Sequence, residues 1–300
     1  MLDVLTGFAI IFTVIAAGWW LAQKKVIGPG EQRLQLNRIA FHVATPSLIF
    51  SSVAVSDTDA FFSPVILVIA IATVVTMLIF WAISAVWFKQ DAAETMAGAA
   101  SSSYYNSVNI GLPIATYVLG DPTYVIPALV LQMAVLSPIV IAGLDRGASG
   151  LLKSVIAGLK APVVVAAFAG FAVSASSWTV PEPVLAPLQI LGGASIPMIL
   201  MSFGASLTGE KVLQSQRLAT TTATILKLIG MPAVAWGVAS LLGLTGSDMY
   251  AALILCALPT AQNVYNYAAT YRSGEVICRD TVFLTTFLSL PAMLLIAGVF

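Results

Sequence analysis

Long apolar runs separated by short polar stretches extend over the whole chain. A helix that crosses a membrane needs about 20 mostly apolar residues, and the sequence contains ten runs of about this length. The predicted spans, numbered in chain order, are Leu2–Leu21, Leu34–Val53, Phe62–Phe88, Ala92–Leu119, Val125–Leu144, Leu151–Ser174, Val184–Leu207, Leu218–Leu242, Met249–Ala269 and Thr281–Phe300. The connections are too short for a soluble domain. The pattern therefore predicts an all-α membrane protein with ten transmembrane helices.

The placement of charged residues supports this count independently. With the N-terminus outside, the predicted cytoplasmic loops hold twelve of the 13 basic residues, namely Lys24, Lys25, Arg33, Arg38, Lys89, Arg146, Lys153, Lys160, Lys211, Arg217, Arg272 and Arg279. The predicted external loops hold only acidic charges, namely Asp3, Asp57, Asp59, Asp121, Glu182 and Asp248. This asymmetry follows the positive-inside rule. It predicts a multi-pass protein of the plasma (inner) membrane with both termini outside.

Composition supports the membrane assignment and excludes several classes of partner. Hydrophobic residues make up 59% of the chain and charged residues 9%, whereas a soluble domain has about a quarter of its residues charged. The net charge of +0 provides no basic excess for nucleic acid. One histidine, His42, and two cysteines form no cluster with metal-ligand spacing. We therefore expect lipid around the chain, and neither a metal nor a cofactor.

The spans divide into two halves of five, residues 1–145 and 146–300. An odd number of spans per half means that the second half enters the membrane from the opposite side, which is the inverted-repeat plan of many transporters. Internal similarity favours this plan, because Pro46 in span two matches Pro197 in span seven. The sequence thus predicts two inverted five-helix repeats.

Spans four and nine each combine asparagines with a proline near their centre. Span four contains Asn106 and Asn109, followed by Gly111 and Pro113. Span nine contains Pro259, then Gln262, Asn263 and Asn266. A carboxamide in lipid must be hydrogen-bonded, and proline removes a backbone donor. Their recurrence in both halves predicts two discontinuous helices whose ends face one binding site.

A simpler interpretation remains open for these two spans. Proline kinks and contacts between asparagines of neighbouring helices also occur in membrane bundles that transport nothing. Tyr104, Tyr105, Tyr265 and Tyr267 flank the two segments. They could stack on an aromatic substrate or simply pack between helices.

Two ionisable side chains are expected deep in spans, His42 in span two and Lys227 in span eight. Lys227 is about ten residues, or roughly 15 Å, from the cytoplasmic end of its span. Both side chains are potentially cationic, and no carboxylate is expected as deep, with Asp280 closest to an exception. This balance favours an anionic substrate. Alternatively, Lys227 hydrogen-bonds carbonyls freed near Pro232, and His42 is a neutral core or interface residue rather than a proton or anion contact.

Several segments in order along the chain resemble the auxin efflux carrier family. They are Leu36–Phe50 in span two, Asn106–Pro113 with its N-x-x-x-x-G-x-P pattern, Ile196–Leu207, Lys227–Pro232, and Pro259–Tyr271. Ser107 and Val108 depart from the small Thr-Gly pair often found there. The long central loop of plant members is missing, since only Asp145–Gly150 joins the halves, which fits a prokaryotic member.

The resemblance implies more than the residue pattern does. It implies the fold of the bile-acid/sodium symporter superfamily, with spans one, two, six and seven as a scaffold that usually forms a homodimer. The other six spans would form a moving core in which spans four and nine cross. Members of the family carry auxin or dicarboxylates such as malate and malonate. The residues implied to line the crossing are Asn106, Asn109, Gly111, Pro113, Pro259, Gln262, Asn263 and Asn266.

These features favour a secondary transporter for a small organic anion, working by alternating access, rather than an enzyme. A cation-coupled symporter of the bile-acid type is an alternative. A channel would need a polar stripe along several helices, and an intramembrane enzyme would need a catalytic constellation that His42 cannot complete.

Overall fold

The computed structural model describes residues 2–28, 35–36, 38–56, 63–120, 124–145, 156, 159–160, 162–176, 178–206 and 212–300. Several charged residues used to orient the spans lie outside the described residues, namely Arg33, Asp57, Asp59, Asp121, Arg146, Lys153 and Lys211. So do Asn37 of the span-two pattern and 146–150 of the link between the halves. The sidedness of the loops therefore stays a prediction.

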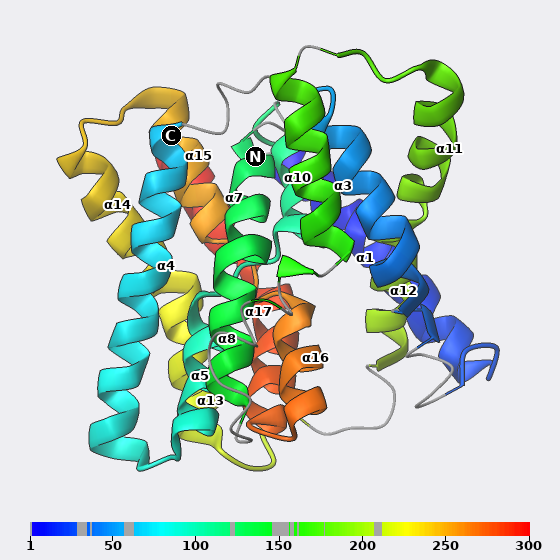
Figure 1. Ribbon diagram of the computed structural model, residues 1–300. Coiled ribbons are helices and arrows are strands. Elements are labelled where there is room, and N and C mark those ends of the chain that lie inside the picture. The colour runs from blue at the N-terminus through cyan, green and yellow to red at the C-terminus, as the bar shows by residue number, and fades with distance from the viewer. Residues whose placement is uncertain are drawn as a thin grey trace. The chain divides into compact units, whose positions relative to one another are not determined.

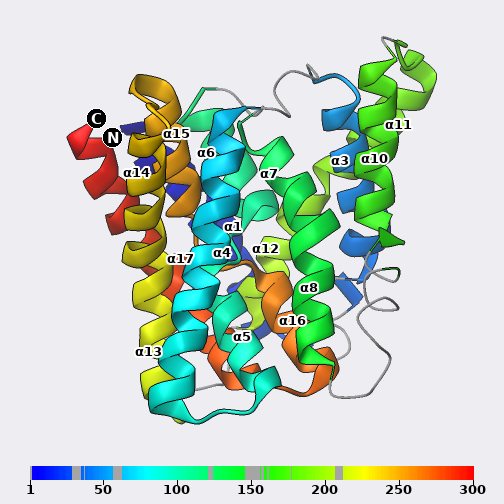
Figure 2. The same cartoon turned by 60° about the vertical axis from the view of Figure 1, so that its left-hand side comes forward.

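Regular secondary structure in the described part of the chain is helical (Figures 1 and 2). The first half contains α1 (Leu2–Gln23), α3 (Thr45–Val53), α4 (Pro64–Ile83), α5 (Ala92–Ser103), α6 (Leu112–Tyr117), α7 (Ile126–Leu131) and α8 (Ser137–Leu144). The second half contains α10 (Pro162–Ala175), α11 (Glu182–Gly193), α12 (Ser195–Ser206), α13 (Arg217–Ile225), α14 (Met231–Leu241), α15 (Gly246–Cys256), α16 (Gln262–Tyr271) and α17 (Glu275–Val299).

Four continuous stretches are long and apolar enough to cross a membrane. Within the described residues they are Pro64–Phe88, Glu182–Ala205, Arg217–Leu241 and Glu275–Val299. Shorter apolar helices occupy Ala9–Gln23, Ala40–Val53, Pro162–Ala175 and Gly246–Cys256. The helical class of the fold is confirmed, while the count of ten spans and the inverted repeat remain predictions.

Four prolines are accommodated by a widened turn rather than by a break. A proline cannot donate to the carbonyl one helical turn earlier, and its ring clashes with that carbonyl. Just before each of these prolines the helix forms a π-helical turn, in which an N–H donates to the carbonyl five residues back. The turns are Ala40–Ala44 before Pro46, Ser107–Gly111 before Pro113, Gln132–Leu136 before Pro138, and Leu226–Gly230 before Pro232.

The chain forms two compact units, each built from both sequence halves. Unit 1 comprises Met1–Leu5, Phe62–Gly158 and Lys211–Phe300, and unit 2 comprises Thr6–Phe61 and Leu159–Glu210. Unit 1 thus contains spans three to five and eight to ten, and unit 2 contains most of spans one, two, six and seven. The family resemblance implies this same partition.

Unit 2 is held by close backbone contacts at glycines. A Cβ on Gly18 of α1 would lie 2.1 Å from the Met201 carbonyl oxygen of α12. A Cβ on Gly204 of α12 would lie 1.9 Å from the Ile15 carbonyl oxygen of α1. Only glycine permits this approach, which is typical of helix packing in membranes. A hydrogen bond of 2.7 Å between the Thr45 and Ser195 hydroxyls also joins α3 to α12.

Unit 1 packs α4 against α5, α14 and α15. Figure 2 shows α13 and α14 following one another beside α4. A buried cluster joins α4 and α5 to α13 and α17, and consists of Phe80, Ala99, Ala219, Ala223 and Ile277.

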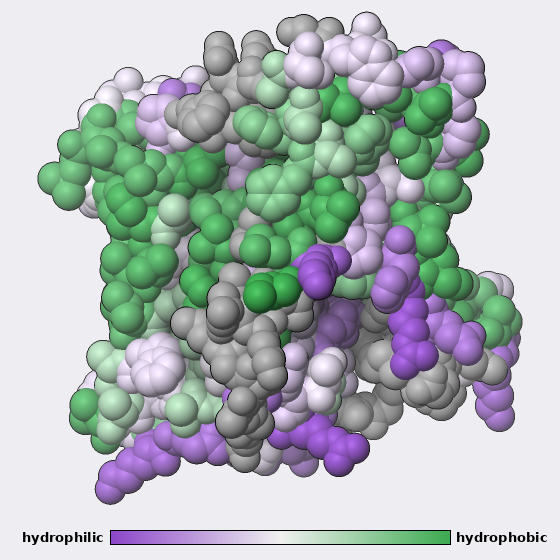
Figure 3. Space-filling model, in the orientation of Figure 1, coloured by the Kyte–Doolittle hydropathy of each residue, from purple (hydrophilic) through white to green (hydrophobic). Residues whose placement is uncertain are grey.

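The outer surface of α4 and α14 is apolar. On the face seen in Figure 3, hydrophobic side chains cover these helices along their length, and hydrophilic ones gather where α4 leads toward α5. Leu78 and Trp236 are each 60% exposed. Exposed apolar side chains at this density suit contact with lipid rather than water.

Candidate functional site

Span four is interrupted between Ser103 and Ser107. α5 ends at Ser103, Tyr104 is extended with φ −78° and ψ 103°, and helical structure resumes at Ser107. Span nine is interrupted between Cys256 and Gln262, where Ala261 is extended with φ −69° and ψ 139°. Both helices predicted to be discontinuous are therefore broken, and both breaks lie in unit 1.

The two broken segments pair with each other. The Asn106 N–H donates to the Pro259 carbonyl oxygen at 2.8 Å, and the Ala261 N–H donates to the Tyr104 carbonyl oxygen at 2.9 Å. Tyr105 and Thr260 face one another in this short antiparallel bridge. The bridge satisfies backbone groups that the breaks remove from the helices. The Ser107–Gly111 turn begins next to one of these two hydrogen bonds, and α16 begins next to the other.

Asn106 and Asn109 have different roles. The Asn106 side-chain oxygen accepts from the Asn109 N–H at 3.1 Å and so caps the helix that follows the break. Asn109 is 5% exposed, and its Oδ1 has no hydrogen-bond partner among the described residues. A buried carbonyl oxygen without a donor is costly. Of these two asparagines, Asn109 is thus the one whose environment calls for a ligand or a water.

Gly111 and the two prolines act through the backbone. A Cβ on Gly111 would lie 2.9 Å from Leu258 Cδ1 and 3.1 Å from the Asn106 carbonyl oxygen, so glycine allows the two segments to approach. Pro113 is the second residue of α6, beyond the π-helical turn. Pro259 lies inside the second break, where its carbonyl accepts from Asn106.

The N-terminus of α16 has no side-chain cap. Ala261 occupies the N-cap position and provides no acceptor. Among the described residues, neither the backbone N–H groups of Gln262 and Asn263 nor the side chains of Gln262, Asn263 and Asn266 make a hydrogen bond to another residue. This end of the helix therefore offers unpaired donors and the positive end of the helix dipole.

Lys227 is fully buried and lies beside the second break. Its ammonium donates to the Cys256 carbonyl oxygen at 2.7 Å and lies 3.3 Å from Met231 Sδ. Lys227 thus makes a hydrogen bond of the kind that the alternative interpretation expected, to a main-chain carbonyl freed from a helix. The acceptor is the last residue of α15, not a carbonyl beside Pro232.

His42 belongs to the other compact unit. It lies on the Ala40–Ala44 turn of unit 2 with its side chain exposed, and its Nδ1 is 2.9 Å from the Arg38 carbonyl oxygen. Unit 2 contains none of the other predicted site residues.

Gln132 supports the first break, although the sequence analysis did not select it. This side chain is 1% exposed, donates to the Tyr105 carbonyl oxygen and accepts from the Ser107 hydroxyl. It therefore links a residue inside the break to the first residue of the helical turn that follows. The available signal was a glutamine within an apolar span, which is costly unless it is paired.

Thr260 ties the second break to two neighbouring helices. Its hydroxyl donates to the Ser101 carbonyl oxygen of α5 at 2.6 Å, and its N–H donates to the Thr285 hydroxyl of α17 at 3.0 Å. The bridge is thus held from both sides by hydroxyl groups.

The tyrosines beside the breaks pack inside unit 1. Tyr104 is 1% and Tyr105 0% exposed. The Tyr104 hydroxyl bonds Ser137, which also lies 3.2 Å from the Tyr267 hydroxyl, and the Tyr105 hydroxyl donates to the Ala128 carbonyl oxygen at 2.8 Å. These contacts favour the packing interpretation for Tyr104, Tyr105 and Tyr267. Figures 1 and 2 both show α16 beside α8, the two helices that this network joins.

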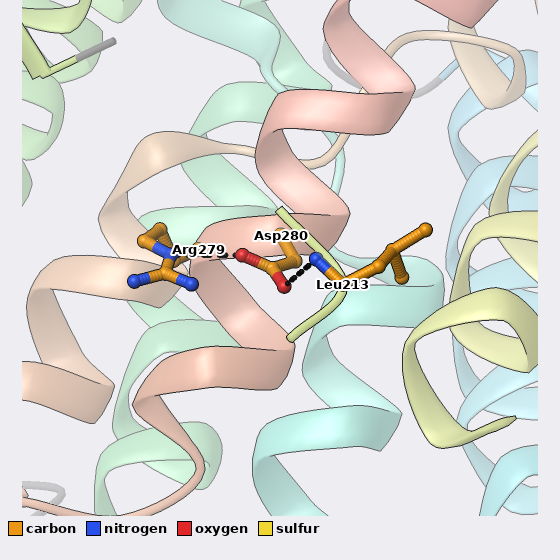
Figure 4. A network of polar contacts seen from close by, with 3 residues as sticks. All are labelled: Leu213, Arg279 and Asp280. Carbon is orange, nitrogen blue, oxygen red and sulfur yellow. Dashed lines mark hydrogen bonds and ion pairs between the residues drawn. The ribbon is translucent and has the colours of Figure 1, made fainter. Parts of the chain in front are cut away.

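Asp280, the carboxylate named as closest to an exception, is buried like Lys227 but lies near the start of its helix. Asp280 is 0% exposed in α17, which begins at Glu275 rather than at the predicted Thr281. Its carboxylate accepts from the Arg279 guanidinium and from the Leu213 N–H, each at 2.8 Å. Figure 4 shows the carboxylate between these two donors. Leu213 has a φ of +60°. Asp280 therefore anchors the turn before α13, and its charge is already paired.

An open groove of about 620 Å³ lies elsewhere in unit 1. It is lined by the segments Trp87–Gln90 and Gln214–Ala219 together with Glu94. None of the predicted site residues lines this groove. Among the described residues no three His, Cys, Asp or Glu side chains could hold a metal ion together.

Comparison with known proteins assigns the chain to a family. A family model described as "Membrane transport protein" matches residues 3–153 and 146–297. A protein of Rhizobium meliloti named "Putative malonate transporter" is 25% identical over 303 residues, covering 96% of this chain and 93% of that relative. A protein of Methanothermobacter thermautotrophicus named "Uncharacterized transporter" is 23% identical over 301 residues, covering 94% of each chain.

The family match, which extends over nearly the whole chain, agrees with the apolar helices. It identifies a multi-pass membrane transporter and not an enzyme. The chain belongs to the membrane transport protein family, the auxin efflux carrier family that its sequence resembles.

Proposed function

We propose that this protein carries a small organic anion across the membrane and binds it at the paired breaks of spans four and nine. One observation carries the proposal. An uncapped helix N-terminus and the Asn109 side-chain oxygen, which has no hydrogen-bond partner among the described residues, lie beside a single backbone bridge in unit 1.

The α16 N-terminus supplies the attraction for an anion. Backbone N–H groups at a helix start bind carboxylates well, because they combine unpaired donors with a partial positive charge. The N–H groups of Gln262 and Asn263 fill this role, with the Asn263 and Asn266 carboxamides as further contacts. No described side chain caps this helix end, so an anion would bind there without displacing one.

The buried Asn109 oxygen adds a requirement for a donor. An acceptor in this position is satisfied by a ligand O–H or by a bound water. A singly protonated dicarboxylate offers a carboxylate and a carboxyl O–H in one small molecule. This chemistry, and the name of the Rhizobium meliloti relative, make malonate the first substrate to test.

Transport proceeds by alternating access in this proposal. Unit 1 moves with the bound anion, and unit 2 serves as the scaffold through which two copies form a homodimer. In a plasma membrane that is negative inside, outward movement of the anion is favoured by about 2.3 kcal/mol per charge per 100 mV.

Uptake into proteoliposomes tests the proposed site. Purified protein is reconstituted and the counterflow of radiolabelled malonate, malate and indole-3-acetate is measured for the wild type, Asn109→Ala and Asn263→Ala. Gln214→Ala, an exposed side chain away from the breaks, is the matched control. Saturable flux that falls at least about tenfold in both asparagine variants, but not in the control, supports the site.

Two results would reject this proposal. Unchanged flux in both asparagine variants would remove the breaks from consideration as the binding site. Single-channel currents in a planar bilayer would indicate a channel in place of a carrier.

A further inference from the structure

The Lys227 ammonium contacts the C-terminal end of α15 inside unit 1. The last carbonyls of a helix lack intrahelical donors and carry its partial negative charge. At this end the Leu253 carbonyl accepts from the Ala257 N–H at 2.9 Å, whereas the Cys256 carbonyl accepts from the Lys227 ammonium at 2.7 Å. The cation therefore satisfies the carbonyl at which the helix stops.

Lys227 has no other strong partner in the described part of the chain. No carboxylate pairs with it, and its second contact is the Met231 sulfur at 3.3 Å. A buried ammonium without a counter-charge is costly. The helix end thus provides the compensation that an acidic side chain would give elsewhere.

The position of Lys227 makes it unlike a substrate contact. The side chain is 0% exposed, and its ammonium donates to a main-chain oxygen, whereas the uncapped N–H groups and the Asn109 oxygen have no partner within the described part of the chain. An anion bound to the ammonium would compete with the carbonyl that already holds it.

We propose that Lys227 is a positioning residue, a tethered cation that neutralises the C-terminal end of α15 and holds the second break in shape. It acts on transport through the backbone of Ala257–Ala261, and the transported anion does not touch it. The effect on flux rests on the proposed function, while the effect on the backbone does not.

Hydrogen exchange of the substrate-free protein tests the backbone effect. Deuterium uptake is followed by mass spectrometry in peptides that cover Ala257–Ala261, for the wild type, Lys227→Met and the control Lys89→Met. Methionine keeps the length and removes the charge, and Lys89 is exposed at the end of the α4 segment. We expect exchange to be faster by at least about tenfold in Lys227→Met only, because a charge-assisted hydrogen bond is lost.

Chemical rescue separates the need for a cation from the need for packing. In Lys227→Ala, propylammonium supplies the atoms removed from the side chain and should restore slow exchange. Propanol, which has a similar shape and no charge, should not. Exchange in Lys227→Met equal to that of the wild type, or equal restoration by both compounds, would overturn the proposal.

Transport kinetics then distinguish positioning from contact. A positioning role lowers the maximal rate of Lys227→Met by about tenfold and leaves KM within about twofold. A rise in KM with an unchanged maximal rate would identify Lys227 as a substrate contact and would contradict the assignment. If the wild type carries none of the tested anions, the proposed function fails while the exchange experiment still decides the role of Lys227.

Discussion

The two helix breaks of unit 1 pair with each other, yet they satisfy their ends differently. The first break caps its own helix start, because Asn106 accepts from the Asn109 N–H. The second break leaves the start of α16 uncapped and instead satisfies the end of α15 with Lys227. The helical turn after the first break is thus capped at its N-terminal, positive end, whereas the N-terminal end of α16 is uncapped. In the proposed function, the anion therefore approaches from the α16 side.

The largest effect, a loss of stability, is expected at Gln132, whose two hydrogen bonds support only the first break. Gln132→Leu removes both of its hydrogen bonds and leaves buried groups of Tyr105 and Ser107 with fewer partners. We expect a loss of about 1–3 kcal/mol for each group left unpaired. Thermal unfolding in detergent measures this loss, with Gln214→Leu as the exposed control. A melting temperature equal to that of the control would show that Gln132 does not support the break.

Asn109→Asp tests whether the first break contributes an acceptor to the site. The substitution keeps the shape and introduces a negative charge, and like charges in close contact cost several kcal/mol. Malonate flux should therefore fall by at least about tenfold, and further than in Asn109→Ala. Flux in the aspartate variant equal to that in the alanine variant would place the anion away from Asn109.

Two substitutions of Asn106 test whether its side chain acts as a helix cap. Asn106→Ala removes the cap and should cost about 1 kcal/mol, whereas Asn106→Asp retains a good capping acceptor and should unfold at the wild-type temperature. Equal destabilisation by both substitutions would mean that the Asn106 side chain has a role other than capping.

The sequence located the two breaks well but not their cause. It associated the interruption of span four with Pro113, since proline lacks an N–H. The chain instead breaks at Tyr104–Asn106, and a π-helical turn accommodates Pro113. In span nine Pro259 does lie within the break. Proline spacing alone cannot distinguish these outcomes, because partners distant in sequence decide whether a widened turn or a break forms.

The hydrogen-bond partners of the candidate residues were harder to predict than the candidates themselves. The asparagines were selected because they recur beside a proline in both halves of the chain. Lys227 was selected as an ionisable residue deep in an apolar span, but its acceptor, the Cys256 carbonyl, is 29 residues away and has no side-chain signature. Gln132 and Thr260 were missed, since single polar residues in apolar spans reveal neither their direction nor their partners.

Ala261→Ser tests the central claim most directly, because it closes the end of the second break that the account requires to be open. The extended Ala261 backbone suits an N-cap, and the serine hydroxyl would accept from an N–H of the first turn of α16. We predict a gain of about 0.5–1 kcal/mol in stability, together with a rise of about threefold or more in the malonate KM, because the anion loses a donor at the helix end. A stabilised variant with an unchanged KM would contradict anion binding at the α16 N-terminus.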